Sequence, residues 1–161
     1  MNSSQKTAYY GIFAALAIII GWVEMMIPLP VPVPGVKIGL ANVIVVMSMY
    51  YFDNKTALGI SFIRIVISGL LFSGFSVFLY SVAGAILSFI IMVLAKDIIK
   101  FNIYSVSILG GICHNIGQIV IASIVVKTNL SIYMPILIIS GLITGALIGI
   151  IAKNCLTHIK R

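Results

Sequence analysis

Charged residues are scarce in this chain. Of its 161 residues only ten are basic and three acidic, so 8% are charged while 61% are hydrophobic. Soluble domains carry about 25% charged residues, and a domain of this length could not hide so much apolar surface from water. The composition therefore excludes a soluble domain. We expect an all-α integral protein of the cell membrane, in which residues 1–161 form a single transmembrane domain of about six helices at about 20 residues per span.

The three acidic residues, Glu24, Asp53 and Asp97, are widely separated. An enzyme that uses magnesium on a diphosphate needs clustered carboxylates, and the chain also lacks a Walker A sequence for ATP. The two cysteines, Cys113 and Cys155, stand far apart and have no metal-ligand spacing around them. We therefore expect no enzymatic activity, no metal ion and no cofactor.

Hydropathy predicts six membrane spans joined by short connections. The first apolar stretch is too long for the core of a signal peptide and lacks a small-residue cleavage site, so we expect it to remain as a span. The predicted spans are residues 8–27, 38–52, 57–72, 75–95, 104–126 and 133–152.

The connection at residues 28–37 has an unusual composition, with prolines at positions 28, 30, 32 and 34. Proline fixes φ and lacks a backbone N–H, so this segment is predicted to be extended and stiff.

The basic residues are scattered, and no basic run exceeds two residues. We therefore expect them to set the orientation of the chain in the membrane and not to form a nucleic-acid surface. Placing both termini in the cytoplasm leaves seven basic residues inside and two outside, in agreement with the positive-inside rule, and makes residues 28–37 an extracellular loop. The inside set is Lys6, Lys55, Lys96, Lys100, Lys153, Lys160 and Arg161, and the outside pair is Lys37 and Lys127.

Arg64 lies near the middle of the third predicted span. An intramembrane arginine costs about 2.5 kcal/mol or much more, and it normally faces a partner or a wet cavity. Glu24 is the only acidic residue predicted to lie within the membrane, and helix geometry lets the two side chains barely meet. Two interpretations remain open: an internal ion pair with Glu24, or an anionic substrate as the missing counter-ion.

The fifth predicted span carries the polar run His114, Asn115 and Gln118 among glycines. His114 and Gln118 are one helical turn apart and share a face that cannot point at lipid. Amides can simply hydrogen-bond between packed helices. Three polar side chains exceed what packing needs, so we expect this set to line a substrate site. A metal or proton-relay role for His114 has no evident second ligand to support it.

Asn42, in the second span, and Lys37, just outside it, complete a candidate substrate-binding set in the outer half of the membrane. Lys37 could instead be a snorkelling interface residue. The candidate substrate-binding residues are Lys37, Asn42, Arg64, His114, Asn115 and Gln118.

Small residues four apart form ridges on two predicted spans, and such ridges let helices approach closely. The first span has Gly11 with Ala15, and Ala17 with Gly21, which serve either internal packing or docking of another membrane subunit. Gly141, Gly145 and Gly149 form a similar ridge on the sixth span.

Five segments together carry a family resemblance. They are GLANVIVV (39–46), the Arg64 span, FLYSVAGAILS (78–88), HNIGQ (114–118) and ISGLITGALIG (139–149). Over nearly the whole chain they resemble the Gx transporter family, which also carries the older label heptaprenyl diphosphate synthase component I. That family is similar to the substrate-binding S components of energy-coupling factor (ECF) transporters, which are small six-helix membrane proteins.

The resemblance implies a mechanism. An S component captures a vitamin-like substrate outside the cell, in a pocket capped by its first external loop, and then topples in a complex with a transmembrane coupling subunit and two ATPases. Its first helix docks on the coupling subunit through an Ala-xxx-Ala strip, to which Gly11 and Ala15 correspond here. The resemblance thus implies binding of a small, anionic, vitamin- or cofactor-like substrate, with flavin-like molecules and prenyl or quinone precursors both compatible with the residues.

Two other functions remain as alternatives. One is an accessory membrane subunit of a redox or isoprenoid/quinone pathway that scaffolds a partner enzyme, as the older label suggests. The other is an autonomous proton-coupled carrier, for which Glu24 is the only plausible intramembrane carboxylate.

Overall fold

The computed structural model describes residues 3–26, 39–72 and 74–159, and these residues form helices joined by short turns. The predicted extended loop at 28–37, including Lys37, lies outside the described residues. A π-helical turn, Leu94–Ile98, continues α4, and a 3-10 turn, Ser131–Tyr133, precedes α6. The six α-helices are α1 (Ser3–Met26), α2 (Asn42–Tyr51), α3 (Asn54–Phe72), α4 (Phe75–Val93), α5 (Ile103–Val126) and α6 (Met134–Ile159).

Five of these helices, all except α2, are long and apolar enough to cross a membrane. At 1.5 Å per residue the ten residues of α2 are too short for a hydrocarbon core of about 30 Å. The span predicted at 38–52 is therefore present as a short helix. Its residues 43–49 are all buried, so α2 is enclosed by protein on every side, which explains why it is mostly apolar without being a full span.

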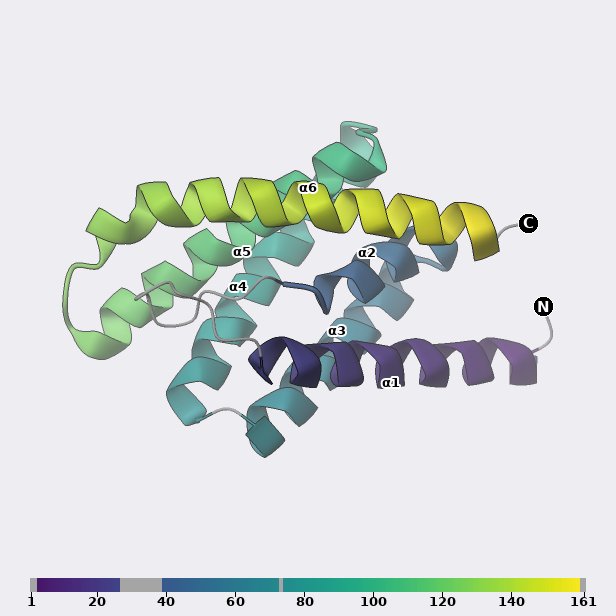
Figure 1. The fold of residues 1–161 in the computed structure, drawn as a ribbon, viewed down its shortest axis with the longest axis horizontal. Helices are drawn as coiled ribbons and strands as arrows, with labels where there is room; N and C mark the ends of the chain where they lie inside the picture. Colours follow the sequence, from purple (N-terminus) through teal and green to yellow (C-terminus); the bar gives the residue numbers. More distant parts are fainter. Residues whose placement is uncertain (1–2, 27–38, 73, 160–161) are drawn as a thin grey trace.

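The helices alternate in direction, so that the beginning of α1 and the end of α6 lie at the same end of the bundle (Figure 1). We call this the terminal end. The end of α1, the beginning of α2, the end of α3 and the beginning of α4 lie toward the opposite end (Figure 1). The side of the membrane on which this end lies stays a prediction.

Glycines allow α4, α5 and α6 to pack backbone against backbone. A Cβ built on Gly117 of α5 would lie 2.8 Å from the carbonyl oxygen of Ala83 on α4, and one on Gly111 would collide with the carbonyl oxygen of Gly141 on α6. The predicted ridge on the sixth span, which includes Gly145, therefore packs against α5 and is not free for another subunit.

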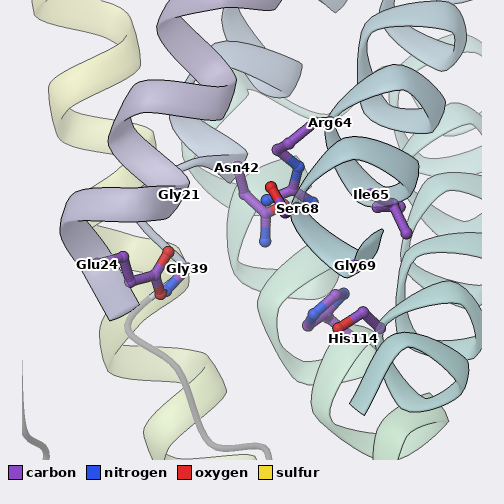
Figure 2. Close-up of a pocket in the computed structure, with 10 residues that line it drawn as sticks. Gly21, Glu24, Gly39, Asn42, Arg64, Ile65, Ser68, Gly69 and His114 are labelled. Atoms are coloured by element: carbon purple, nitrogen blue, oxygen red, sulfur yellow. The ribbon is translucent and has the colours of Figure 1, made fainter. Parts of the chain in front are cut away.

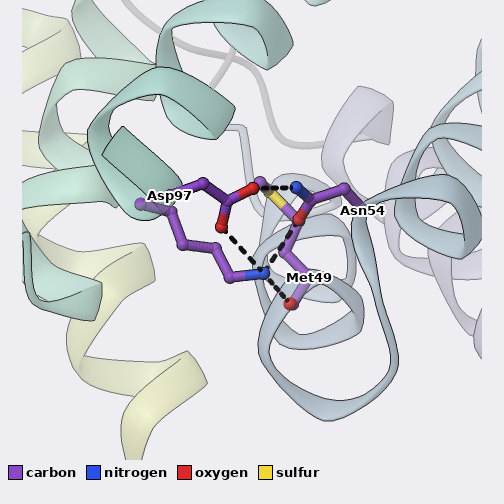
Figure 3. Close-up of polar contacts among 4 residues, drawn as sticks. Met49, Asn54 and Asp97 are labelled. Carbon is purple, nitrogen blue, oxygen red and sulfur yellow. Dashed lines mark hydrogen bonds and ion pairs between the residues drawn. The ribbon is translucent and has the colours of Figure 1, made fainter. Parts of the chain in front are cut away.

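A polar cluster fixes the terminal end of the bundle (Figure 3). The Lys96 ammonium donates hydrogen bonds to the carbonyl oxygen of Met49 at 2.6 Å and to Oδ1 of Asn54 at 2.8 Å. The Asn54 amide donates to the Asp97 carboxylate, which also lies 3.9 Å from Lys96. The π-helical turn at the end of α4 carries Lys96 and Asp97, and the cluster joins that turn to the α2–α3 connection.

Candidate binding cavity around Arg64

A cavity of about 50 Å³ lies where the end of α1 meets the beginning of α2, the second half of α3, and parts of α4 and α5 (Figure 2). It is therefore located away from the terminal end of the bundle. Its lining residues are Gly21, Glu24, Gly39, Asn42, Arg64, Ile65, Ser68, Gly69, Ser81 and His114.

Arg64 presents an unmet hydrogen-bond donor in this cavity. Its Nε is fully buried and has no partner among the residues that the structure describes. The hydroxyl of Ser68, one turn further along α3 and on the same face, is likewise buried without a partner in the described part of the chain. Buried polar groups are nearly always hydrogen-bonded, so two such groups in the lining of one cavity mark it as a candidate binding site.

Glu24 lines the same cavity but binds the backbone instead of the arginine. Its side chain is 6% exposed and accepts a hydrogen bond from the backbone N–H of Gly39. Gly39 has a φ of +79°, a left-handed conformation that suits glycine, and its carbonyl accepts the N–H of Asn42 at 2.8 Å to start α2. The possible Glu24–Arg64 ion pair is not formed: within the described ranges no ion pair within 4 Å joins these two residues.

Asn42 and His114 complete the polar lining. Asn42 is the first residue of α2, and its side chain lies near Gly39, where a Cβ would be 3.3 Å from Nδ2 of Asn42. His114 reaches the cavity from α5 (Figure 2). Arginine, asparagine and histidine together offer N–H donors to an oxygen-rich anionic group, while Glu24 has one carboxylate oxygen already engaged.

Asn115 and Gln118 lie outside the residues that line the cavity. Asn115 is buried, and its Nδ2 donates a hydrogen bond of 2.8 Å to the carbonyl oxygen of Leu137 on α6. Gln118 is buried where α5 meets α4, with its Cγ 2.8 Å from where a Gly84 Cβ would lie. Of the six predicted substrate-binding residues, the structure therefore brings together Asn42, Arg64 and His114.

Sequence reasoning missed several lining residues, including Ser68, Ser81 and Gly39. A signal existed for Ser68, because it lies four residues after Arg64 and must share its helix face. Ser81 and Gly39 have no comparable local signal, since only the packing of α4 and of α2 against α3 brings them to the cavity.

The two small-residue ridges of α1 have different environments. Gly11 and Ala15 are exposed, and a Cβ on Gly11 would meet nothing within 4 Å. Ala17 is fully buried, and Gly21 faces Ser68 and Ala41, so this second ridge packs within the chain.

Several long apolar helices that enclose a polar cavity define a helical membrane protein. Within the described residues, no group of three or more His, Cys, Asp or Glu side chains is placed to hold a metal ion. The chain belongs to the heptaprenyl diphosphate synthase component I family, whose model matches residues 13–155 and thus spans the whole cavity lining. This confirms the family resemblance under that label. Searches of curated proteins and of solved structures gave no match.

Proposed function

We propose that this chain is a non-catalytic substrate-binding subunit, the S component of an ECF-type importer in the cell membrane, and that its cavity captures a small anionic substrate from outside. The observation that supports this most is the buried Nε of Arg64, unpartnered among the described residues, in a cavity that also contains Asn42 and His114. An arginine is retained at membrane depth, despite its cost, where it has a function.

The proposed orientation follows from the distribution of charge. With the terminal end in the cytoplasm, Lys55 and Lys96 lie inside, in agreement with the positive-inside rule. The cavity, toward the opposite end of the bundle, then lies in the outer half of the membrane. In this arrangement the short α2 does not cross the membrane by itself but packs inside the bundle against α1, α3 and α6.

Each cavity residue has a proposed role in binding. Arg64 supplies positive charge, Asn42 an orienting amide, and His114 a hydrogen bond or a stacking surface. Lys37 keeps its predicted role as a second cation. We assign Asn115 and Gln118 to helix packing, because Asn115 already binds α6 and Gln118 packs on α4.

The proposed partners are a transmembrane coupling subunit and two ATPases. The exposed Gly11–Ala15 strip on α1 is the proposed docking surface for the coupling subunit, since small residues allow close helix contact.

The second candidate function is an accessory subunit that scaffolds a partner enzyme, and the family description favours it. A prenyl diphosphate synthase itself would need clustered carboxylates to hold magnesium. Glu24, Asp53 and Asp97 come from separate parts of the chain, so under this alternative the catalytic residues would belong to the partner.

Purification of the tagged chain from its native membranes separates the two candidates. We expect a coupling subunit and two ATPases to co-purify, and the variant Gly11→Leu/Ala15→Leu to lose them while it remains folded. A matched control, Ile12→Phe, changes an exposed neighbouring position on α1 and should retain the partners. Recovery of only a biosynthetic or redox enzyme would contradict the transporter proposal and favour the scaffold.

A further inference from the structure

A second hollow lies beside the cavity, in the groove between α3 and α4. Its volume is about 280 Å³, and ten of its eleven lining residues are hydrophobic, Ser61 being the exception. Phe62, Leu58 and Ile86 line this groove and are 67%, 52% and 56% exposed. Exposed side chains on long apolar helices face lipid in a membrane, so the groove opens sideways into the bilayer.

The groove and the polar cavity share a wall. Ile65 lines both of them. Phe78, from the groove, packs directly on Gly69, from the cavity, and a Cβ on Gly69 would collide with the Phe78 ring. Ile65 therefore belongs to both spaces, and Phe78 packs where the groove comes up against the cavity.

The two spaces have complementary chemistry. The cavity offers the Arg64 guanidinium, whose Nε has no partner among the described residues, and the groove offers almost only hydrocarbon contacts. At about 50 Å³ the cavity alone is far below the 300–1,000 Å³ typical of small-molecule sites. If the head group of a ligand lay in this cavity, its hydrocarbon chain would extend into the larger apolar groove.

We propose that the cavity and the groove form one site for a single-chain anionic amphiphile that enters from the lipid phase. Its phosphate or carboxylate head binds Arg64, and its hydrocarbon chain lies between α3 and α4. This inference rests on the proposed substrate-binding role of the cavity and specifies the class of substrate. Ile65 and Phe78 move aside to admit the chain.

Equilibrium binding of radiolabelled hexadecyl phosphate tests the proposal, with the full chain in nanodiscs of neutral phosphatidylcholine. We expect saturable binding. Inorganic phosphate and uncharged hexadecanol should each displace the radiolabelled ligand at least tenfold less well than unlabelled hexadecyl phosphate does. Alkyl phosphates of increasing chain length should compete progressively better. Arg64→Gln should weaken binding at least tenfold because it removes the charge.

Ala85→Phe is a second, independent variant, because Ala85 lines the groove and is not among the residues that line the cavity. It should also weaken binding about tenfold. Its matched control is Ile90→Phe, which adds the same ring at an exposed α4 position outside the groove and should bind as the wild type does. Melting temperatures of all variants verify that they are folded.

Several results would overturn the proposal. Equal competition by hexadecanol, with no effect of Arg64→Gln, would mean that the groove holds ordinary membrane lipid. Equal competition by inorganic phosphate would mean that the chain is not recognised. If Arg64→Gln loses binding while Ala85→Phe binds as the wild type does, the groove is not part of the site, and the proposed function still stands. If both variants weaken binding but no ATPases co-purify, the amphiphile site stands and the transporter proposal fails.

Discussion

Glu24 and Arg64 line the same cavity without forming an ion pair in the described part of the chain, and the Glu24 carboxylate instead accepts a hydrogen bond from the backbone N–H of Gly39. The carboxylate thus holds the turn that starts α2, and the arginine is left with an Nε that no described residue engages. The single acidic residue that lines the cavity therefore serves the fold. The cation that it could have neutralised remains available to a ligand.

Replacing Arg64 should stabilise the unliganded protein. Replacing a buried ion pair or triad by apolar residues of similar volume is often neutral or stabilising by about 1–4 kcal/mol, and a buried arginine without an ion-pair partner loses no such attraction when it is replaced. We expect Arg64→Met to raise the free energy of unfolding by an amount in this range, measured by denaturation in mixed micelles without ligand. Destabilisation by more than about 1 kcal/mol would indicate that Arg64 has a structural partner.

Removal of the Glu24 carboxylate should have the opposite effect. Glu24→Ala leaves the partly buried Gly39 N–H without its acceptor, which should cost about 1 kcal/mol, the lower end of the range for a buried donor. Glu24→Gln keeps a carbonyl acceptor and should recover most of the loss. If the two variants melt at the same temperature, the hydrogen bond to Gly39 contributes nothing to stability.

Close contacts between α5 and its neighbours should make two glycines intolerant of a methyl group. Gly111→Ala and Gly117→Ala place a Cβ against backbone atoms of α6 and α4, and overpacking typically costs about 1–3 kcal/mol. Gly59→Ala is the matched control on α3, because a Cβ there meets nothing within 4 Å. Alanine in that exposed helical position should stabilise the chain by about 0.5–1 kcal/mol. Thermal unfolding of the three variants measures the two expected losses of stability and the one expected gain. Equal melting temperatures would refute the close packing.

Asp53 should make the stability of α3 depend on pH. Its carboxylate accepts the backbone N–H of Thr56 at 2.7 Å, and mainly this bond lowers the pKa of Asp53 below its ordinary value. A lowered pKa in the folded state gives stabilisation that is complete above the ordinary pKa of about 3.9 and is lost as the pH falls through the lowered value.

The comparison of wild type with Asp53→Ala isolates this effect. At pH 7 the variant should be less stable by about 1 kcal/mol, the usual contribution of an N-terminal cap. The difference should shrink as the pH falls below the ordinary pKa of about 3.9 and the wild-type carboxylate is protonated. A difference that stays constant with pH would contradict a role for the ionised cap.

The sequence predicted the long helices well, because each is a continuous apolar run that only lipid or a core can accommodate. The predicted span at 75–95 is found as Phe75–Val93, and that at 104–126 as Ile103–Val126. The sequence could not predict that α2 has only ten residues. A helix buried on all sides by protein and a helix buried in lipid have the same apolar composition.

The cavity was predictable in part. Arg64 and His114 are costly in lipid, so their presence in apolar spans is enough to indicate a site. Asn115 and Gln118 carry the same signal, yet they pack on α6 and α4, because hydropathy does not reveal which helix a given face contacts. The role of Glu24 depends on the turn at Gly39, whose left-handed conformation no periodic pattern encodes.

The most direct test of the central claim, that Arg64 holds an anionic ligand, is native mass spectrometry of the chain purified from its own membranes. We predict that the wild type carries a bound anionic small molecule, that Arg64→Gln has lost it, and that Lys55→Gln, which removes an exposed cation from the same helix, keeps it. The same bound species at the same occupancy in Arg64→Gln as in the wild type, with both proteins folded, would contradict the claim.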